Sequence, residues 1–294
     1  MKKKILTLML GFLLIAVNLY AAGDLIVGGN AGIGTTTPTA KLDVVGNIKG
    51  TGGSMWLDGV TGTTPVSGAG TRLMWIPAKG AFRAGQVTGI QWDDINIGTN
   101  SFAFGKDAKA SGPSSIVLGS NPATAWPSSA TAYGAVAIAG SQVSQNFSVG
   151  IGVGNVVSGQ TAVAIGGLLT ASGTNSVNLG QYGVTSGIGS ILIGSFVGGD
   201  VYNSISSAGV GSIVIGTVGD YGYMDATGDY SIAIGKNLQA TAISAMAFGR
   251  DFTNSTANSF AVGFGQIDLL VTGGNVGIGT TTPAYKLDVA GTVN

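Results

Sequence analysis

The sequence of 294 residues contains no cysteine, no histidine and no glutamate, so all 13 acidic residues are aspartates. Without histidine, a serine or cysteine nucleophile lacks its usual imidazole base, and without cysteine no thiolate can bind a metal. Charged residues make up only 9% of the chain, against about a quarter in typical soluble domains. These absences exclude the commonest catalytic and metal-binding constellations, and we expect no catalytic residue, no metal site and no cofactor.

Aspartate groups are the remaining candidates for acid–base chemistry. Asp93 and Asp94 are adjacent, and Asp220, Asp225 and Asp229 follow one another closely. Paired carboxylates can hydrolyse glycosides, but a loop aspartate commonly accepts hydrogen bonds from its own backbone and favours turns. We favour the turn interpretation for both groups.

The N-terminus has the order of regions of a secretory signal peptide. Lys2–Lys4 precede an apolar run from Ile5 to Val17, and small residues follow at Ala21–Gly23. We predict a signal peptide over residues 1–22, because the apolar run is shorter than the roughly 20 residues that span a bilayer. Its three lysines, taken from 13 basic residues, leave 10 against 13 acidic residues. We therefore expect an exported chain, associated with the cell surface or outer membrane or extracellular, with no nucleic-acid partner and no membrane-spanning segment after cleavage.

One five-residue phrase recurs eleven times between residues 101 and 263. It reads small, large apolar, small, large apolar, Gly, and its start-to-start spacings are 14, 20, 13, 14, 14, 14, 22, 19, 14 and 14. A fixed period of this kind predicts a solenoid. The phrases are Ser101–Gly105, Ser115–Gly119, Ala135–Ala139, Ser148–Gly152, Ala162–Gly166, Ser176–Gly180, Ser190–Gly194, Ser212–Gly216, Ser231–Gly235, Ala245–Gly249 and Ser259–Gly263.

Each coil of 14 residues is predicted to contain two short strands and two turns. In a strand, Ile116 and Leu118 share one face, whereas Ser115, Val117 and Gly119 share the other. We expect the large apolar face to fill a core and the small face to admit another layer. The glycine at the end of the phrase permits a sharp bend, and a second bend signal follows about seven residues later.

Such a coil is not stable alone. Ordering its residues costs about 20 kcal/mol at roughly 1.5 kcal/mol each, whereas two buried large side chains return about 3–6 kcal/mol. Backbone hydrogen bonds to the coils above and below must supply much of the difference, and no disulfide can contribute. We therefore expect burial against further copies of the chain, in a homo-oligomer.

Two near copies of one segment bracket the repeats. Residues 30–46 and 275–291 correspond at a constant offset of 245. Each copy is predicted to turn at its Thr-Pro step and then to form a short strand through Lys-Leu-Asp-Val. The predicted organisation is a signal peptide (1–22), an N-terminal bracket segment (23–50), a Trp-rich cap (51–100), the repeats (101–265) and a C-terminal bracket segment (266–294), for which truncation is one interpretation.

Three of the four tryptophans, Trp56, Trp75 and Trp92, fall in residues 51–100, where the repeat is absent. The run from Arg72 to Gly85 mixes aromatic and basic side chains, which could form a stacking platform with cations. We favour a cap that seals the open end of the solenoid, because an unpaired strand edge invites aggregation.

The longer spacings indicate three insertions, after the phrases that begin at Ser115, Ser190 and Ser212. Insertions in a solenoid lie in loops, often on one binding face, and tyrosine, tryptophan and aspartate suit protein or sugar surfaces. The alternative is that these loops are tolerated and their aromatic side chains pack back on the solenoid. The candidate binding residues are Trp126, Tyr133, Tyr202, Asp220, Tyr221, Tyr223, Asp225 and Tyr230.

The repeated phrase resembles the head repeat of trimeric autotransporter adhesins, the YadA-like head family, in which Asn-Ser-Val-Ala-Ile-Gly precedes a small-residue turn. Asn-Ser begins the strand at Asn100–Ser101, Asn175–Ser176 and Asn258–Ser259. The resemblance implies an all-β, left-handed parallel β-roll wound as an intertwined homotrimer. The bracket segments look like segments of bacterial surface proteins and phage tail fibres.

The leading functional hypothesis is therefore a non-catalytic adhesin head, a rigid trimeric rod that attaches to host, matrix or glycan surfaces. Its expected partners are two further copies of itself and a surface protein or glycan receptor. The first alternative is a phage-tail-fibre-like receptor-binding or structural module, and the second is a β-helical enzyme that acts on polysaccharides.

Overall fold

The structure, a computed structural model, describes residues 27–119, 127–196, 204–219 and 222–292. The predicted signal peptide lies outside these ranges. The chain divides into two compact units, Met1–Leu57 and Asp58–Asn294, and each is described by itself.

The first unit contains the N-terminal bracket segment, in which β1 (Ala31–Ile33) pairs in parallel with β2 (Leu42–Val44). The Asp43 carboxylate accepts hydrogen bonds from the Thr39 backbone N–H (2.9 Å) and hydroxyl (3.0 Å). These bonds, the backbone one first, lower the pKa of Asp43. They close the turn that follows the proline, and β2 is the strand predicted from Lys-Leu-Asp-Val.

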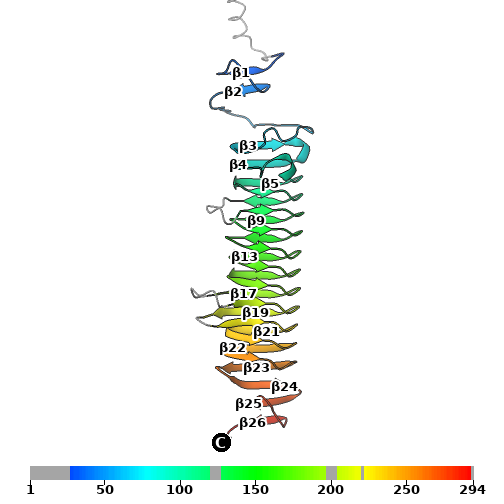
Figure 1. Cartoon of the computed structure of the whole chain (residues 1–294), viewed down its shortest axis with the longest axis vertical. Helices are drawn as coiled ribbons and strands as arrows, with labels where there is room; N and C mark the ends of the chain where they lie inside the picture. Colours follow the sequence, from blue (N-terminus) through cyan, green and yellow to red (C-terminus); the bar gives the residue numbers. More distant parts are fainter. Residues whose placement is uncertain (1–26, 120–126, 197–203, 220–221, 293–294) are drawn as a thin grey trace, which may run out of the picture. The chain divides into compact units, whose positions relative to one another are not determined.

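The second unit is a stack of coils that follow one another in chain order (Figure 1). Each coil contributes a first strand, which the repeated phrase forms in every case except β4, and the first strands pair in parallel into one ladder. This first ladder comprises β4 (Ala81–Val87), β5 (Phe102–Lys106), β7 (Ile116–Leu118), β9 (Val136–Ile138), β11 (Val149–Ile151), β13 (Val163–Gly167), β15 (Val177–Gln181), β17 (Ile191–Phe196), β19 (Ile213–Val218), β21 (Ile232–Ala240), β22 (Ala245–Asn254) and β23 (Ser259–Phe264).

The second strands of the coils pair in parallel into a second ladder, and the long strands β21 and β22 take part in both ladders. The register advances by one coil per pairing, as from Val163 to Val177 to Ile191, which confirms the 14-residue coil with two strands. The second ladder comprises β6 (Lys109–Ala110), β8 (Ser129–Ala130), β10 (Gln142–Val143), β12 (Val156–Val157), β14 (Thr170–Ala171), β16 (Gly183–Thr185), β18 (Ser204–Ser207) and β20 (Tyr223–Ala226).

The orientation of the first strands contradicts the expectation that the large side chains fill the core. The small residues at the first and third positions of the phrase are buried, as at Ser115 and Val117, whereas Ile116 is 39% exposed and Phe104 is 53% exposed. The physical reason is width, because a 14-residue coil encloses too narrow a space for large side chains on both walls. Where the third position is Gly150, an added Cβ would lie 2.9 Å from Val143 of the opposite strand.

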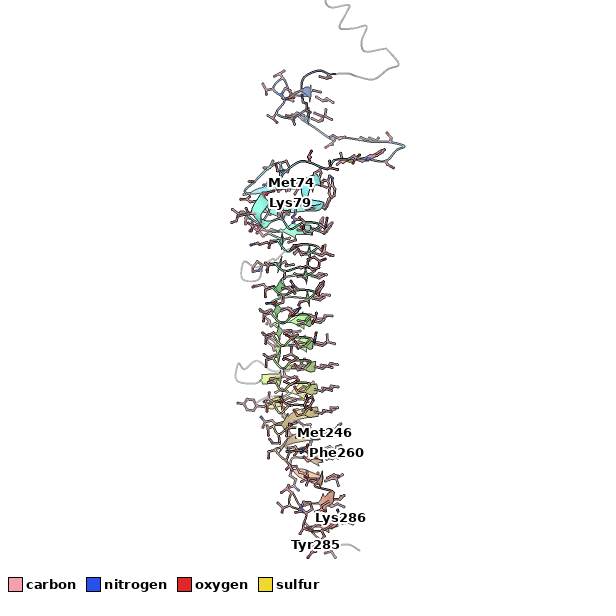
Figure 2. The ribbon with its side chains drawn as sticks, turned by 90° about the vertical axis from the view of Figure 1, so that its right-hand side faces the viewer. Met74, Lys79, Met246, Phe260, Tyr285 and Lys286 are labelled. Atoms are coloured by element: carbon pink, nitrogen blue, oxygen red, sulfur yellow. The ribbon has the colours of Figure 1, made fainter. Side chains whose placement is uncertain are left out.

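The large apolar side chains therefore form an outward-facing row, here called the apolar ladder, along all eleven phrases. Met246 and Phe260 are neighbours in it (Figure 2). Its members are Phe102, Ile116, Val136, Val149, Val163, Val177, Ile191, Ile213, Ile232, Met246 and Phe260 at the second position, and Phe104, Leu118, Ile138, Ile151, Ile165, Leu179, Ile193, Ile215, Ile234, Phe248 and Val262 at the fourth.

Glycine at the end of the phrase lets adjacent coils approach. Gly180 has a φ of 134°, and a Cβ added there would lie 1.6 Å from the carbonyl oxygen of Gly194 in the next coil. The one phrase that ends in alanine instead adopts a φ of 58° at Ala139, and it is also the phrase followed by the short spacing of 13. The alanine at this corner thus has a different backbone conformation from the glycine of other coils, with a φ of 58° at Ala139 against 134° at Gly180.

Antiparallel strands lie at both ends of the parallel stack. At the N-terminal end β3 (Gly70–Ile76) pairs antiparallel with β4. The connections around them contain the short 3₁₀ helices η1 (Pro77–Lys79) and η2 (Asp94–Asn96). Trp92 is buried and donates a hydrogen bond to the Ala108 carbonyl (2.8 Å), whereas Trp75 is 39% exposed. Trp56, in the first unit, is 84% exposed.

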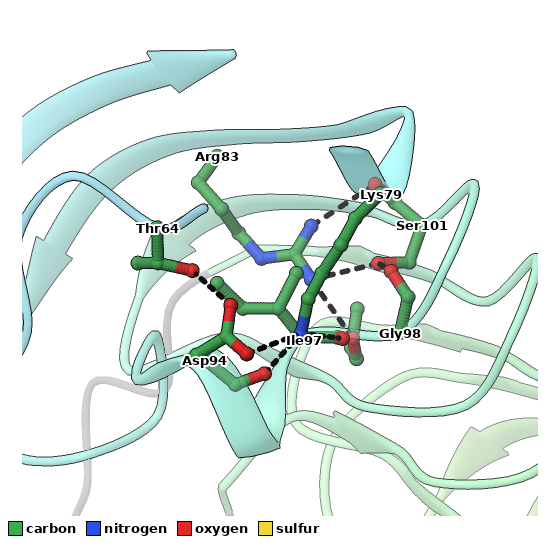
Figure 3. Close-up of polar contacts among 8 residues, drawn as sticks. Thr64, Lys79, Arg83, Asp94, Ile97, Gly98 and Ser101 are labelled. Carbon is green, nitrogen blue, oxygen red and sulfur yellow. Dashed lines mark hydrogen bonds and ion pairs between the residues drawn. The ribbon is translucent and has the colours of Figure 1, made fainter. Parts of the chain in front are cut away.

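A buried arginine fills the interior of the stack at this end (Figure 3). The guanidinium of Arg83 donates to the carbonyls of Phe82 (2.8 Å), Ser101 (3.0 Å) and Ala110 (2.9 Å), and to the Ser101 hydroxyl (2.7 Å). Burial lowers the pKa of Arg83 to about 10, so the side chain stays charged at neutral pH. It bridges the backbone of three segments where the regular ladder begins.

Next to it, Lys79 and Asp94 hold the two connections together (Figure 3). The Lys79 ammonium lies 3.2 Å from the Asp94 carboxylate, and it also donates to the Asp94 and Ile97 carbonyls. The Thr64 hydroxyl donates to Asp94 (2.8 Å). The bond from Thr64 first, and then the bond from Lys79, lower the pKa of Asp94.

At the C-terminal end, β23 pairs antiparallel with β24 (Ile267–Thr272), which pairs antiparallel with β25 (Asn275–Ile278). The strand β26 (Leu287–Val289) pairs in parallel with β25. Asp288 accepts a hydrogen bond from the Ala284 N–H (2.9 Å), as Asp43 does from Thr39 in the N-terminal copy. The two bracket segments therefore share their internal strand pair and turn.

Candidate functional site

The outer surface of the second ladder differs in chemistry from the apolar ladder. Its outward positions, which pair in register from coil to coil, are mostly polar, and we call this surface the polar face. They are Lys109, Ser129, Gln142, Val156, Thr170, Val184, Ser206, Asp225, Gln239 and Thr253. The two ladders thus offer one surface suited to apolar contact and one suited to hydrogen bonding.

All length variation among the coils falls at one corner. From the outward residue of the second strand to the start of the next phrase, every coil has the same interval of six residues, as from Gln142 to Ser148. At this fixed corner the opening serine closes a tight turn, since the Ser115 hydroxyl donates to the Gly112 carbonyl (2.6 Å). The residue before the phrase is left-handed, as at Asn175 with a φ of 59°.

The opposite corner, between the phrase and the second strand, is the variable corner. It carries all three insertions, in the connections β7–β8, β17–β18 and β19–β20. Residues 120–126, 197–203 and 220–221 lie outside the described residues, and with them the candidates Trp126, Tyr202, Asp220 and Tyr221. At the third insertion the structure describes the chain up to Gly219 and again from Gly222.

Two of the predicted binding residues, Tyr223 and Asp225, lie where the third insertion meets the polar face. Both point outward from β20, and Tyr223 is 50% exposed. Asp225 accepts a hydrogen bond from the Gln239 amide (3.3 Å), and Gln239 accepts one from the Thr253 hydroxyl (2.9 Å). Three consecutive coils therefore present a connected row of polar groups.

A second row runs beside it at the variable corner. Asn237 and Asp251 are both left-handed, with φ of 50° and 60°, and the Asn237 amide donates to the Asp251 carboxylate (2.9 Å). The Asn237 oxygen accepts from the Gly219 N–H (3.0 Å). Gly222 packs so closely that an added Cβ would lie 2.2 Å from that oxygen. Asn237 thus anchors both ends of the third insertion.

The two rows enclose a shallow depression of about 240 Å³ that spans three coils. Its lining is predominantly polar, and Tyr223, which follows the third insertion, contributes an aromatic residue to it. The lining residues are Gly222, Tyr223, Asn237, Gln239, Asp251, Phe252 and Thr253.

The charges around the depression are balanced. Arg250 Nε lies 4.0 Å from the Asp251 carboxylate, and both side chains are largely exposed, at 63% and 44%, so the attraction between them is weak. Lys236 is also exposed, and its Nζ lies near Gly219. No strong field of one sign selects a charged ligand here.

The other two described candidates, Tyr133 and Tyr230, lie at the fixed corner and are separate from the depression. Tyr133 contacts Phe147 of the next coil edge to face, with ring centroids 5.2 Å apart. The ring of Tyr230 lies close to Gly211 of the preceding coil. A Cβ added at Gly211 would be 3.1 Å from Cδ1 of that ring. The structure therefore groups Tyr223 with Asp225 and does not bring Tyr133 or Tyr230 to them.

Sequence reasoning missed Asn237, Gln239, Asp251 and Thr253, because it looked only inside the insertions. The signal was present in the period, since Tyr223, Asn237 and Asp251 are spaced by 14, as are Asp225, Gln239 and Thr253. Among the described residues, no three acidic side chains gather as metal ligands would. Those residues also include no helix with the length and apolar character of a membrane span.

Part of the chain matches a known family. Residues 97–121, 144–168 and 226–251 match the family described as YadA head domain repeat (2 copies). No curated protein matches the chain. The third matched range begins at Ala226, the last residue of β20, and includes β21 and much of β22.

Proposed function

Because residues 97–251 carry YadA head domain repeats, we propose that the chain is the head of a homotrimeric adhesin that attaches to host, matrix or glycan surfaces. YadA head domains are non-catalytic modules of bacterial cell-surface adhesins, and they imply a trimeric autotransporter adhesin head. The left-handed winding and the intertwined trimer belong to this proposal.

The observation that carries the trimer is the apolar ladder. It sets two large apolar side chains per coil on the outside of eleven coils, and several are about 40% exposed, including Ile165 and Ile193. Completing their burial would contribute on the order of 10–20 kcal/mol before the costs of association. An exposed apolar row of this length marks a protein interface.

Attachment would then use the polar face and the variable corner, which the apolar ladder leaves free. The insertions add aromatic and acidic side chains at that corner alone, and the described groups there are hydrogen-bonded to one another. Export through a signal peptide over residues 1–22 would place the head at the cell surface, associated with the outer membrane or released outside the cell.

Oligomeric mass tests the proposal directly. In sedimentation equilibrium, the mature chain is expected at three times its own mass. Ile165→Asp places a charge in the apolar ladder and is expected to dissociate the trimer, whereas Thr170→Asp, on the polar face of the same coil, leaves it intact. A stable wild-type monomer would overturn the trimer.

Attachment is the second test. Beads coated with the wild-type chain are expected to adhere to surfaces coated with matrix proteins or with glycans, and beads coated with the Ile165→Asp variant to adhere far less. Equal adhesion of wild-type and uncoated beads on every surface contradicts the adhesin function.

A phage-tail-fibre-like module is the second candidate, because the two bracket segments repeat one strand pair and turn at both ends of the chain. Such a module needs no export. Cleavage within residues 18–24 during expression in a Gram-negative host, read by mass spectrometry of the N-terminus, supports the adhesin, whereas an intact N-terminus in the cytoplasm supports the fibre module. The polysaccharide-acting enzyme has no supporting observation.

A further inference from the structure

We infer that the depression beside the third insertion is a binding site for a neutral saccharide, a sugar unit with adjacent hydroxyl groups. The inference rests on the proposed adhesin function and names the ligand class that its head would recognise. It concerns Tyr223, Asn237, Gln239, Asp251 and Thr253, from three consecutive coils.

The lining offers the hydrogen-bonding groups that a sugar requires. Each sugar hydroxyl both donates and accepts, and the depression presents amides at Asn237 and Gln239, a carboxylate at Asp251 and a hydroxyl at Thr253. A carboxylate and an amide side by side can bind two neighbouring hydroxyls at once. The half-exposed Tyr223 ring can pack against the C–H face of a sugar ring, as aromatic side chains do when one side of a ligand is apolar.

These groups are already held in place. Asn237 is fixed by the Gly219 N–H (3.0 Å) and by Asp251 (2.9 Å), and Gln239 is fixed by Asp225 and Thr253. Side chains that are ordered before binding lose less conformational entropy when the ligand arrives, so even a small site gains affinity. The hydrogen bonds among them use only part of their capacity, which leaves an Asp251 oxygen and one amide hydrogen each on Asn237 and Gln239 for a ligand.

The size and charge of the site select the ligand class. A volume of about 240 Å³ holds about one sugar ring but no folded protein segment. Asp251 is balanced by Arg250, so neither an anionic sugar nor a basic peptide gains from a net field. A single site of this kind binds weakly, and three copies on one trimer would raise the avidity.

The test uses the full mature chain and two sets of immobilised oligosaccharides, one of neutral hexoses and one with the same backbones carrying carboxylates. Wild-type chain is expected to bind neutral members, with little dependence on salt concentration. Tyr223→Ala, which removes the ring, and Thr253→Val, which removes the hydroxyl, are each expected to weaken binding about tenfold. Tyr223→Phe retains the ring and most of the binding.

The matched control is Tyr285→Ala, since Tyr285 is 74% exposed and lies in the C-terminal bracket segment. It is expected to bind as the wild type does. Circular dichroism and oligomeric mass check each variant, and both Tyr223 and Thr253 are exposed enough for their replacement to leave the core intact.

The outcomes separate the two proposals. If the wild-type chain adheres to a protein-coated surface, binds no neutral oligosaccharide and is unaffected by Tyr223→Ala, the saccharide site is overturned and the adhesin function stands. Preference for the carboxylate-bearing set, or unchanged sugar binding in both variants, also overturns the site. If the wild-type chain adheres to neither glycan nor protein surfaces, the adhesin function fails as well.

Discussion

Replacing Gly180 by alanine tests whether the approach of adjacent coils requires glycine at the end of the phrase. Gly180 combines a φ of 134° with a backbone neighbour, the Gly194 carbonyl oxygen, that would lie 1.6 Å from the new Cβ. No side-chain rearrangement relieves this contact, because both groups belong to the backbone of paired strands.

The expected cost follows from what must move. Separating the two coils enough to admit a methyl group breaks or stretches the hydrogen bonds of β15 with β17, where five residues pair from Val177 to Gln181. Each such bond contributes about 1 kcal/mol, and the backbone strain at φ 134° adds to this. We expect Gly180→Ala to lower the free energy of unfolding by more than about 4 kcal/mol, which is exceptional for one methyl group.

Gly189→Ala is the matched control. Gly189 also has a positive φ, 66°, but a Cβ there meets nothing within 4 Å, so only about 1–2 kcal/mol of left-handed strain is expected. The midpoints of guanidinium unfolding, followed by far-ultraviolet circular dichroism, measure the stability of both variants against the wild-type chain. Equal shifts in the two midpoints would refute the argument that coil approach, and not φ alone, requires the glycine.

Two further predictions concern charged groups near the N-terminal end of the stack. Arg83→Ala is expected to lower the free energy of unfolding by about 3–5 kcal/mol, because it leaves a void and unpaired buried carbonyls; Arg83→Met fills the space and should cost less, and equal losses in thermal melts would contradict this. The depressed pKa of Asp94 stabilises the fold above the ordinary aspartate pKa near 4, and this contribution is lost as the pH falls through the lower folded-state pKa. Stability should thus be flat from about pH 5 to 9, since there is no histidine, and Asp94→Asn should reduce the loss below pH 4 in acid titrations.

Much of the fold was predictable because the residues that recur with the period have simple effects on the backbone. The 14-residue spacing, the alternation within Val163–Gly167 and the glycine at the end of ten of the eleven phrases are sufficient for stacked coils of two strands. The confirmed features depend on local geometry, namely side-chain alternation and the freedom of glycine. They need no knowledge of what surrounds the coil.

The direction of the large side chains could not be read from alternation, which defines two faces without saying which is inside. The decision depends on the width of the coil. Ile116 and Leu118 would suit the interior of a wide solenoid, but here the smaller Ser115 and Val117 face the interior. A larger inward side chain on one strand is matched by a smaller residue on the opposite strand. Asn178 is buried where Gly183 faces it, and a Cβ on Gly183 would lie 2.7 Å from the Asn178 oxygen.

The candidate site was predictable in part. Tyr223 and Asp225 were predicted because the third insertion interrupts the 14-residue spacing. Tyr223 lines the depression, and Asp225 is hydrogen-bonded to Gln239, which also lines it. Asn237 and Asp251 look ordinary in the sequence, since they sit in coils of regular length, and their importance appears only when residues 14 apart are placed side by side. A ligand site on a solenoid is built across coils, so the sequence displays it in separate pieces.

The constant length of one corner bears on how the proposed recognition surface and the proposed trimer surface are separated on this fold. The fixed corner has the same length in every coil, and many coils close it with a serine such as Ser115 or with a glycine that packs on the next coil, as Gly159 does on Gly173. Any insertion there would break that packing. The variable corner is bounded by the phrase on one side and by the polar face on the other, and the first strands before and after each insertion keep their register. Changes in ligand recognition can therefore accumulate while the surface proposed to hold the trimer together stays the same.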